Sequence, residues 1–374
     1  MVQRGPSSGR RRFNFHEKLK GSIVTTDGKG RVLVTGNLGY IGTVLVPMLR
    51  HRGWEVVGLD TGFFPATGFF KADVSPDRQL IADVRDVQPD SLPPVEAVIH
   101  LAALSNDPMG ALDPALTDEI NHRASVRLAE IVKERGASRF LFSSSCSIYG
   151  AGASLSLTEE DEFAPQTAYA HSKVDTEHDL RLLASDTFSP VFLRNATAFG
   201  VSPSMRFDLV VSNLTGWGWT EGKIKILSDG SPWRPLVHIR DISNAFITLL
   251  EIDREKVHNQ AFNIGRDENN YQVRDMAAAV QRLLTGTEVV YAGAGEADSR
   301  DYNVSFKKLR ALTAEPIIHW SLEAGVAELI GTLQARGLTR EEFAGAPAVR
   351  LKQLAGLMES GRLDDTLRWV GGHG

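Results

Sequence analysis

A glycine-rich turn between a strand and a helix constrains this chain more than any other feature. The apolar run Arg31–Thr35 ends directly before the turn Gly36–Gly42, whose glycines follow the spacing G-x-x-G-x-x-G. A helix is predicted to follow from Tyr40 to His51. Glycines allow backbone N–H groups to approach a ligand closely, and the helix start adds the positive end of its dipole. A turn with a purely structural role can have the same glycine pattern, but the flanking strand and helix favour a pyrophosphate site.

Strand and helix patterns alternate through the first half of the chain. Further strands are predicted at Glu55–Asp60, Val95–Leu101, Arg139–Ser143, Pro190–Arg194 and Ala261–Gly265, and helices at Asp118–Arg135, Ala170–Ala184 and Asp241–Glu251. Near-continuous apolar strands separated by helices are typical of a parallel sheet covered on both faces. We therefore expect an α/β fold with a Rossmann-type doubly wound sheet. The C-terminal third has a mostly helical pattern, with Thr339 and Asp364 as expected helix caps.

Composition excludes several classes of partner. The net charge of −5 gives no global basic field for nucleic acid. The single cysteine, Cys146, allows neither an intramolecular disulfide nor a cysteine-based zinc site. No uninterrupted apolar run approaches the ~20 residues that span a bilayer. We expect a cytoplasmic protein with no metal and no membrane or nucleic-acid partner.

A carboxylate follows the second predicted strand. Asp60 lies about 20 residues after the glycines, where an acidic side chain accepts hydrogen bonds from an adenosine ribose 2′-OH. A 2′-phosphate would be repelled there, and no arginine or lysine stands in the next few residues to receive it. This favours NAD over NADP, although a strand-end turn would also explain the aspartate. Asp83 lies where an adenine edge could be read.

Tyr169 and Lys173 lie four residues apart on one face of a predicted helix. An ammonium beside a phenol lowers the phenol pKa and so makes tyrosine a usable base. An ordinary solvated helix pair has the same spacing. However, the strand that precedes this helix ends in the hydroxyls of Ser143, Ser144 and Ser145, which could relay a proton.

Together these motifs resemble the extended short-chain dehydrogenase/reductase family, specifically its nucleotide-sugar epimerases and dehydratases. The matching segments are GNLGYIG, Asp60, ADVRD, HLAALSNDP, Asn121, FSSSCSIYG, YAHSK, RPLVHIRDI and FNIG, in the family's order over about residues 31 to 310.

The resemblance implies roles for individual residues. Tyr169 would be the base, Lys173 its activator and a ribose ligand, and Ser145 the hydroxyl partner. NAD would be bound by Gly36, Gly39, Tyr40, Ile41, Gly42, Asp60, Asp83, Val84, Leu101, Ala102, Ala103, Asn121, Tyr169 and Lys173. The nucleotide sugar would be bound by Ser105, Ser145, Cys146, Thr197, Asn213, Leu214, Arg234 and Arg300.

The residues after Ser145 distinguish between the reactions that the family catalyses. Dehydratases and decarboxylases of the family carry a carboxyl residue there, whereas this chain has Cys146 and Ser147. Without that acid, loss of water lacks its proton donor. We therefore expect an NAD-dependent 4-epimerase, with a 4,6-dehydratase or another 4-keto-sugar-forming enzyme as the alternative. A non-catalytic NAD-binding sensor is a remote third possibility, because such proteins tend to lose the tyrosine or lysine.

Some positions depart from the family pattern. The position of the family's asparagine is occupied by Thr197 in this chain, and an asparagine, Asn195, stands two places earlier. Cys146 is a possible acid/base at C3 or C5, or a small buried side chain. Trp217, Trp219 and Trp233 could stack on a base or sugar, or pack in the core.

We expect four parts in the chain. They are a mobile arm at 1–29, an NAD-binding domain at 30–194 plus 236–265, a nucleotide-sugar-binding lobe at 195–235 plus 266–336, and a helical tail at 337–374. In the tail, Leu351, Leu354, Leu357 and Met358 recur at helical spacing, which indicates packing on the body or on a partner subunit. A homodimer is expected.

Overall fold

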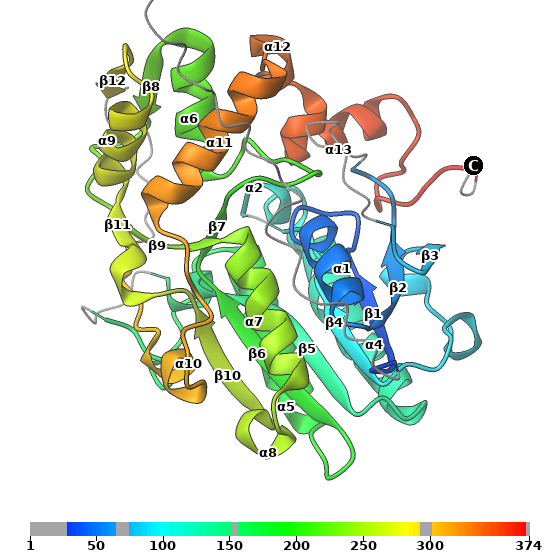
Figure 1. Cartoon of the computed structure of the whole chain (residues 1–374). Helices are drawn as coiled ribbons and strands as arrows, with labels where there is room; N and C mark the ends of the chain where they lie inside the picture. The colour runs from blue at the N-terminus through cyan, green and yellow to red at the C-terminus, as the bar shows by residue number, and fades with distance from the viewer. Residues whose placement is uncertain (1–27, 65–74, 106, 151–155, 292–300, 372–374) are drawn as a thin grey trace, which may run out of the picture.

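A seven-stranded parallel sheet forms the centre of the computed structural model (Figure 1), which describes residues 28–64, 75–105, 107–150, 156–291 and 301–371. The strand order is β3-β2-β1-β4-β5-β6-β10. The strands are β1 (Arg31–Thr35), β2 (Glu55–Asp60), β3 (Arg78–Ile81), β4 (Ala97–His100), β5 (Arg139–Ser145), β6 (Ser189–Asn195) and β10 (Gln260–Ile264). The predicted Rossmann-type doubly wound sheet is confirmed.

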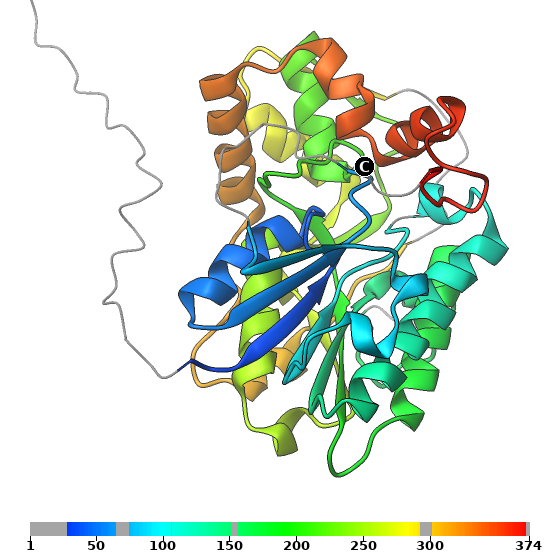
Figure 2. The same cartoon turned by 90° about the vertical axis from the view of Figure 1, so that its right-hand side faces the viewer.

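Two layers of helices cover this sheet. One face packs on α1 (Gly42–His51) and α7 (Ile239–Glu251), and the other packs on α4 (Ala124–Glu134) and α5 (Ala168–Leu182). Figure 2 views the sheet between these layers. The strands read as apolar runs because both of their faces are buried, and every residue of β4 and β6 is buried.

A smaller lobe lies beyond the carboxyl ends of the strands. It holds the sheets β11-β9-β7 and β12-β8 and three longer helices around one apolar core. Its elements are β7 (Thr197–Phe199), α6 (Val210–Glu221), β8 (Lys223–Ile226), β9 (Trp233–His238), β11 (Asn270–Gln272), α9 (Val273–Leu283), β12 (Glu288–Tyr291) and α11 (Leu322–Arg336).

Short helices connect and close the fold. They are α2 (Asp107–Gly110), α3 (Pro114–Asp118), α8 (Arg254–Val257), α10 (Lys307–Leu312), α12 (Arg340–Ala344) and α13 (Arg350–Glu359), with single turns η2 (Val84–Asp86), η3 (Pro89–Ser91), η5 (Cys146–Tyr149), η6 (Asp267–Asn269) and η7 (Ala346–Ala348). In the described ranges, every helix is too short or too polar to span a bilayer.

The structure differs from the sequence-based expectation in several elements. Strand β3 was not predicted, because this edge strand is half exposed and lacks an apolar run. The predicted helix Asp118–Arg135 is interrupted by a π-helical turn, η4 (Glu119–Arg123). Asp364 caps no helix, since its carboxylate accepts from the backbone N–H groups of Thr366 and Arg368 and so organises a turn.

The tail packs on the body of the same chain, which is one of its two expected arrangements, and Trp217 packs against apolar side chains. Thr339 caps α12 in a reciprocal pair with Glu342. Leu354 and Leu357 are buried in a core shared with the body of the same chain. Trp217 packs edge-on against Phe343, with ring centroids 5.1 Å apart. The N-terminal arm, apart from residues 28 and 29, lies outside the described residues.

Candidate active site

A cleft opens where the carboxyl ends of the central strands meet the smaller lobe. The strand order reverses at β1, which is where doubly wound sheets bind ligands. Most of the predicted site residues line this cleft, namely Gly36, Gly39, Tyr40, Ile41, Gly42, Asp60, Asp83, Val84, Leu101, Ala102, Ala103, Ser105, Ser145, Tyr169, Lys173 and Thr197.

The glycine turn needs its glycines for steric reasons. Gly36 has φ +69°, and a Cβ there would lie 2.8 Å from the backbone nitrogen of Ala102. A Cβ at Gly42 would lie 2.5 Å from the Cα of Asn37. Because real Cβ atoms do not approach so closely, larger residues would push the loop and the helix start apart. The turn thus keeps a surface without side chains at the start of α1, which suits a diphosphate.

Asp60 ends β2 beside this turn. Its carboxylate accepts hydrogen bonds from the backbone N–H groups of Leu38 at 3.0 Å and Gly62 at 2.9 Å. Burial raises the pKa of Asp60, while these two hydrogen bonds lower it. The turn and the carboxylate together fit the diphosphate and ribose of a dinucleotide.

The next carboxylate, Asp83, is already paired. It caps η2 and accepts from the Arg85 guanidinium at 2.7 Å. Less of this carboxylate is therefore left for a ligand than sequence reasoning assumed.

Lys173 is held at the centre of the cleft. It is 3% exposed, and its Nζ donates to the carbonyl of Ser143 at 2.8 Å. The ammonium lies 5.6 Å from the ring centroid of Tyr169, one helical turn earlier on α5. Burial lowers the pKa of Lys173 to about 7. Tyr169 and Ser145 line the same cleft, so the three predicted catalytic residues are brought together.

A buried polar network supports the strand that carries these serines. Glu177 on α5 accepts from Ser144 Oγ at 2.6 Å and pairs with Arg194 at 2.8 Å. Arg194 also donates to the Tyr149 hydroxyl at 2.9 Å. Because the network is buried and its charges are paired, it fixes the end of β5 relative to α5.

Asn121 does not line the cleft but holds the loop that does. This residue is 1% exposed, and its Oδ1 accepts from the backbone N–H of Leu104 at 2.8 Å while its Nδ2 contacts Ser172 at 3.2 Å. It therefore ties the loop Leu101–Ser105 to α5. It lies in the π-helical turn, a feature common at functional sites.

Several residues predicted to bind substrate lie away from the cleft lining. Cys146 is 1% exposed and its thiol donates to the Arg194 carbonyl at 3.1 Å, which argues against the expected substrate contact. Burial raises the pKa of this thiol. Leu214 is buried in the core of the smaller lobe, and Asn213 donates to the Phe207 carbonyl at 2.9 Å.

The two expected arginines have different outcomes. The Arg234 guanidinium lies 5.8 Å from the ring centroid of Tyr302, which itself lines the cleft. Arg300 lies outside the described residues.

Sequence reasoning missed several residues that line the cleft, among them Arg206, Tyr302 and Arg350. Arg206 pairs through Nε and Nη2 with the two carboxylate oxygens of Asp208, and its Nη1 donates to Ser105 Oγ at 3.0 Å. Its Arg-x-Asp spacing is a weak sequence signal for a buried ion pair. Tyr302 and Arg350 have no local signal, because only the tertiary fold brings them to the cleft.

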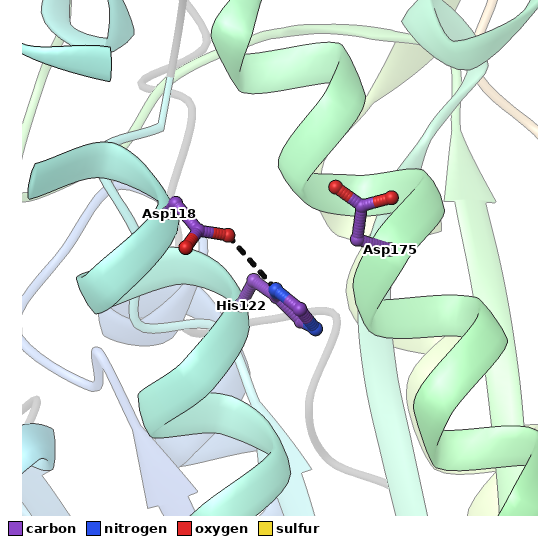
Figure 3. A group of neighbouring side chains, drawn as sticks. All are labelled: Asp118, His122 and Asp175. Carbon is purple, nitrogen blue, oxygen red and sulfur yellow. Dashed lines mark hydrogen bonds and ion pairs between the residues drawn. The ribbon is translucent and has the colours of Figure 1, made fainter. Parts of the chain in front are cut away.

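One group of possible metal ligands lies outside the cleft. Asp118, His122 and Asp175 approach one another between η4 and α5 (Figure 3). The His122 ring nitrogens already contact Asp118 and Asp179, each at 2.8 Å. Burial lowers the pKa of His122, but the hydrogen bonds to Asp179 and Asp118 outweigh burial and raise it. His122 therefore forms an ion-pair network with Asp118 and Asp179 that joins η4 to α5.

The fold and the cleft define a dinucleotide-binding α/β protein with a tyrosine and a lysine at its centre. The profile of the NAD dependent epimerase/dehydratase family matches residues 32–265, more than half of the chain. The chain therefore belongs to the NAD dependent epimerase/dehydratase family, and its cofactor is NAD.

Individual relatives agree with this assignment. A UDP-glucose 4-epimerase from Bacillus subtilis is 27% identical over 329 residues, which cover 80% of this chain and 94% of the relative. The solved structure of MoeE5 in complex with UDP-glucuronic acid and NAD is 26% identical with a TM-score of 0.71, covering 82% of this chain and 99% of MoeE5. An NAD-dependent NDP-hexosamine 5,6-dehydratase of tunicamycin biosynthesis shares the fold, with 22% identity, a TM-score of 0.74, and coverage of 83% and 99%.

Proposed function

We propose that this protein is a nucleotide-sugar 4-epimerase. Bound NAD would supply the hydride acceptor and donor at C4 of the sugar. Tyr169 takes the proton of the sugar 4-OH, and Ser145 hydrogen-bonds to the same oxygen. Lys173 stabilises the phenolate by its positive charge. The 4-keto sugar then turns over in the cleft, and Tyr169 returns the proton as hydride adds to the opposite face.

The residues after Ser145 carry this proposal. Elimination of water needs a group that protonates the departing hydroxyl, and Cys146 and Ser147 provide no carboxyl. Cys146 Sγ is buried and donates to a backbone carbonyl. Epimerisation needs no second acid, so these neutral residues are sufficient for it.

Two buried polar atoms without a hydrogen-bond partner suit a sugar ligand. Ser147 Oγ and Asn195 Oδ1 line the cleft, are buried, and have no hydrogen-bond partner among the described residues. The Asn195 amide nitrogen is held by Ser143 Oγ at 3.1 Å and the Ser144 carbonyl at 3.2 Å, which turns its oxygen away from β5. Unpaired buried polar atoms are costly, and sugar hydroxyls would satisfy both.

A dehydratase is the second candidate, and one observation favours it. Asp107 lines the same cleft at the start of α2, where it accepts from Thr167 Oγ1 at 2.5 Å. This carboxyl could replace the missing acid after Ser145. An exchange experiment at C5 distinguishes the two reactions.

UDP-glucose is the first substrate to test, because the Bacillus subtilis relative is a UDP-glucose 4-epimerase. The purified protein is incubated in D2O with UDP-glucose, and with a panel of other nucleotide hexoses, and the products are examined by NMR. We expect the C4 epimer without deuterium in the sugar. Deuterium at C5, or a 6-deoxy-4-keto product, would establish the dehydratase instead.

The control in this experiment is Tyr169→Phe, which should form neither product.

The expected homodimer stays a prediction that the mass of the protein in solution would test.

A further inference from the structure

The C-terminal segment, residues 338–371, lies over one end of the cleft. In Figures 1 and 2 it runs from orange at α12 to red at the C-terminus, next to the elements that follow β2 and β4. Its side chains share an apolar core with the body of the chain. The members of this core are Phe63, Leu104, Met109, Leu116, Ile120, Leu354, Leu357, Leu363 and Leu367. The segment lies outside the matched family region, 32–265.

Polar contacts fix this segment around Asp60. Trp369 Nε1 donates to the Thr61 carbonyl at 2.8 Å, and Gln353 Nε2 donates to the Phe63 carbonyl at 3.1 Å. Both carbonyls belong to the stretch directly after Asp60, and Arg368 pairs with Asp86 just beyond Asp83. The segment is therefore attached on both sides of the expected adenosine end of the cleft.

Arg350, the first residue of α13, reaches into the cleft from this segment. It is 2% exposed, and its Nη2 donates to the carbonyl and hydroxyl of Ser204 at 3.1 and 2.5 Å. Its guanidinium carbon lies 4.3 Å from the ring centroid of Phe64. Its Nη1 is buried and has no hydrogen-bond partner among the described residues. One arm of the guanidinium is thus available for a ligand.

The neighbouring charged groups do not fully neutralise the positive charge of Arg350. Arg206 repels it, while Asp208 and Asp60 attract it. Both oxygens of Asp208 already receive the Arg206 guanidinium, at 2.9 and 2.8 Å. Burial and Arg206 lower the pKa of Arg350 to about 9. A buried guanidinium with an unpaired N–H is costly unless an anion enters beside it.

We propose that Arg350 binds a phosphate of the dinucleotide and that the C-terminal segment is a clamp that retains the cofactor. The position beside Asp60 and Phe64 favours the cofactor phosphates over those of the sugar nucleotide. A guanidinium suits a phosphate because it keeps its charge and its planar N–H donors when buried, and here the Nη1 donors are the ones that lack a partner. The proposal depends on NAD binding and not on which sugar reaction follows.

The test measures ligand affinity of the full-length protein after its NAD has been removed. Calorimetry gives the Kd for NAD and, separately, for UDP, in the wild type, Arg350→Gln and Lys352→Gln. Lys352 is exposed on the same helix, so the control removes one positive charge close to the cleft without touching it. We expect Arg350→Gln to weaken NAD binding at least tenfold and to leave UDP binding within twofold. Lys352→Gln should leave both unchanged.

Two results would overturn the proposal. One is unchanged affinity for both NAD and UDP in Arg350→Gln, and the other is unchanged NAD affinity with weakened UDP affinity, which would show that Arg350 binds the substrate. Arg350→Lys serves if the glutamine variant does not fold, since it keeps the charge and loses the paired donors. It should still weaken NAD binding severalfold, and wild-type affinity in this variant would count against the proposal.

Discussion

Tyr169 is the residue on which the proposed chemistry depends most directly. Tyr169→Phe removes one oxygen and should lower turnover by about 10²–10⁴-fold, the usual contribution of a general base. NAD content after purification should be unchanged, since the ring stays in place. Tyr291→Phe is the matched control, because this tyrosine is half exposed in the smaller lobe. If cells that carry only Tyr169→Phe kept all functions of the protein, the non-catalytic sensor would be favoured.

Lys173 gives a prediction about stability and pH. Its pKa is lowered from 10.5 to about 7 by burial, so between these values the unfolded chain holds a proton that the folded chain lacks. The free energy of unfolding should therefore rise with pH over this window, by up to about 1.4 kcal/mol per unit. Lys173→Met removes this contribution.

The measurement is urea unfolding of NAD-free wild type and Lys173→Met at several pH values from 6 to 10. The stability of the wild type relative to the variant should increase above about pH 7, whatever the offset between them at low pH. Parallel pH profiles for the two proteins would contradict the assigned pKa.

At the scale of elements, Gly→Ala substitutions in the glycine turn and in α11 should have opposite effects on stability. A Cβ at Gly42 meets backbone atoms at 2.5 Å, whereas a Cβ at Gly331 in α11 meets nothing within 4 Å. Gly42→Ala should cost about 1–3 kcal/mol of stability and weaken NAD binding. Gly331→Ala should instead add about 0.5–1 kcal/mol, because alanine favours a helix interior.

Thermal unfolding and NAD titration of the two variants check this pair. If Gly42→Ala bound NAD as the wild type does, the turn would not approach the cofactor closely.

Elements were predictable from sequence where their pattern is local. The strands of the central sheet are apolar runs, and the Tyr169–Lys173 pair shares a helix face, so spacing alone finds them. Edge strand β3 and the π-helical turn have no such pattern, because pairing and tertiary packing impose them. Arg350 shows the same limit at the site, because it is far from Asp60 in the sequence and only the fold brings its charge near that carboxylate.

For the whole molecule, cofactor binding and tail docking should be coupled. The C-terminal segment closes on Thr61 and Phe63, next to the expected adenosine site. A ligand bound at 100 times its Kd stabilises the folded state by about 2.7 kcal/mol, and part of this should reach the segment that covers it.

Hydrogen exchange followed by mass spectrometry tests this coupling. NAD should slow exchange in residues 350–369 as well as in the glycine turn, and should leave the exposed end of α9 unchanged. Protection confined to the turn would separate the tail from cofactor binding.

This segment follows the central sheet in the sequence, which has a consequence for biosynthesis. Chains leave the ribosome from the N-terminus, and their early domains fold first. The parallel sheet and its glycine turn are then complete before Arg350 is translated. We expect NAD to enter this open nascent domain and the tail to close over it afterwards, so that cofactor loading is a step of protein maturation.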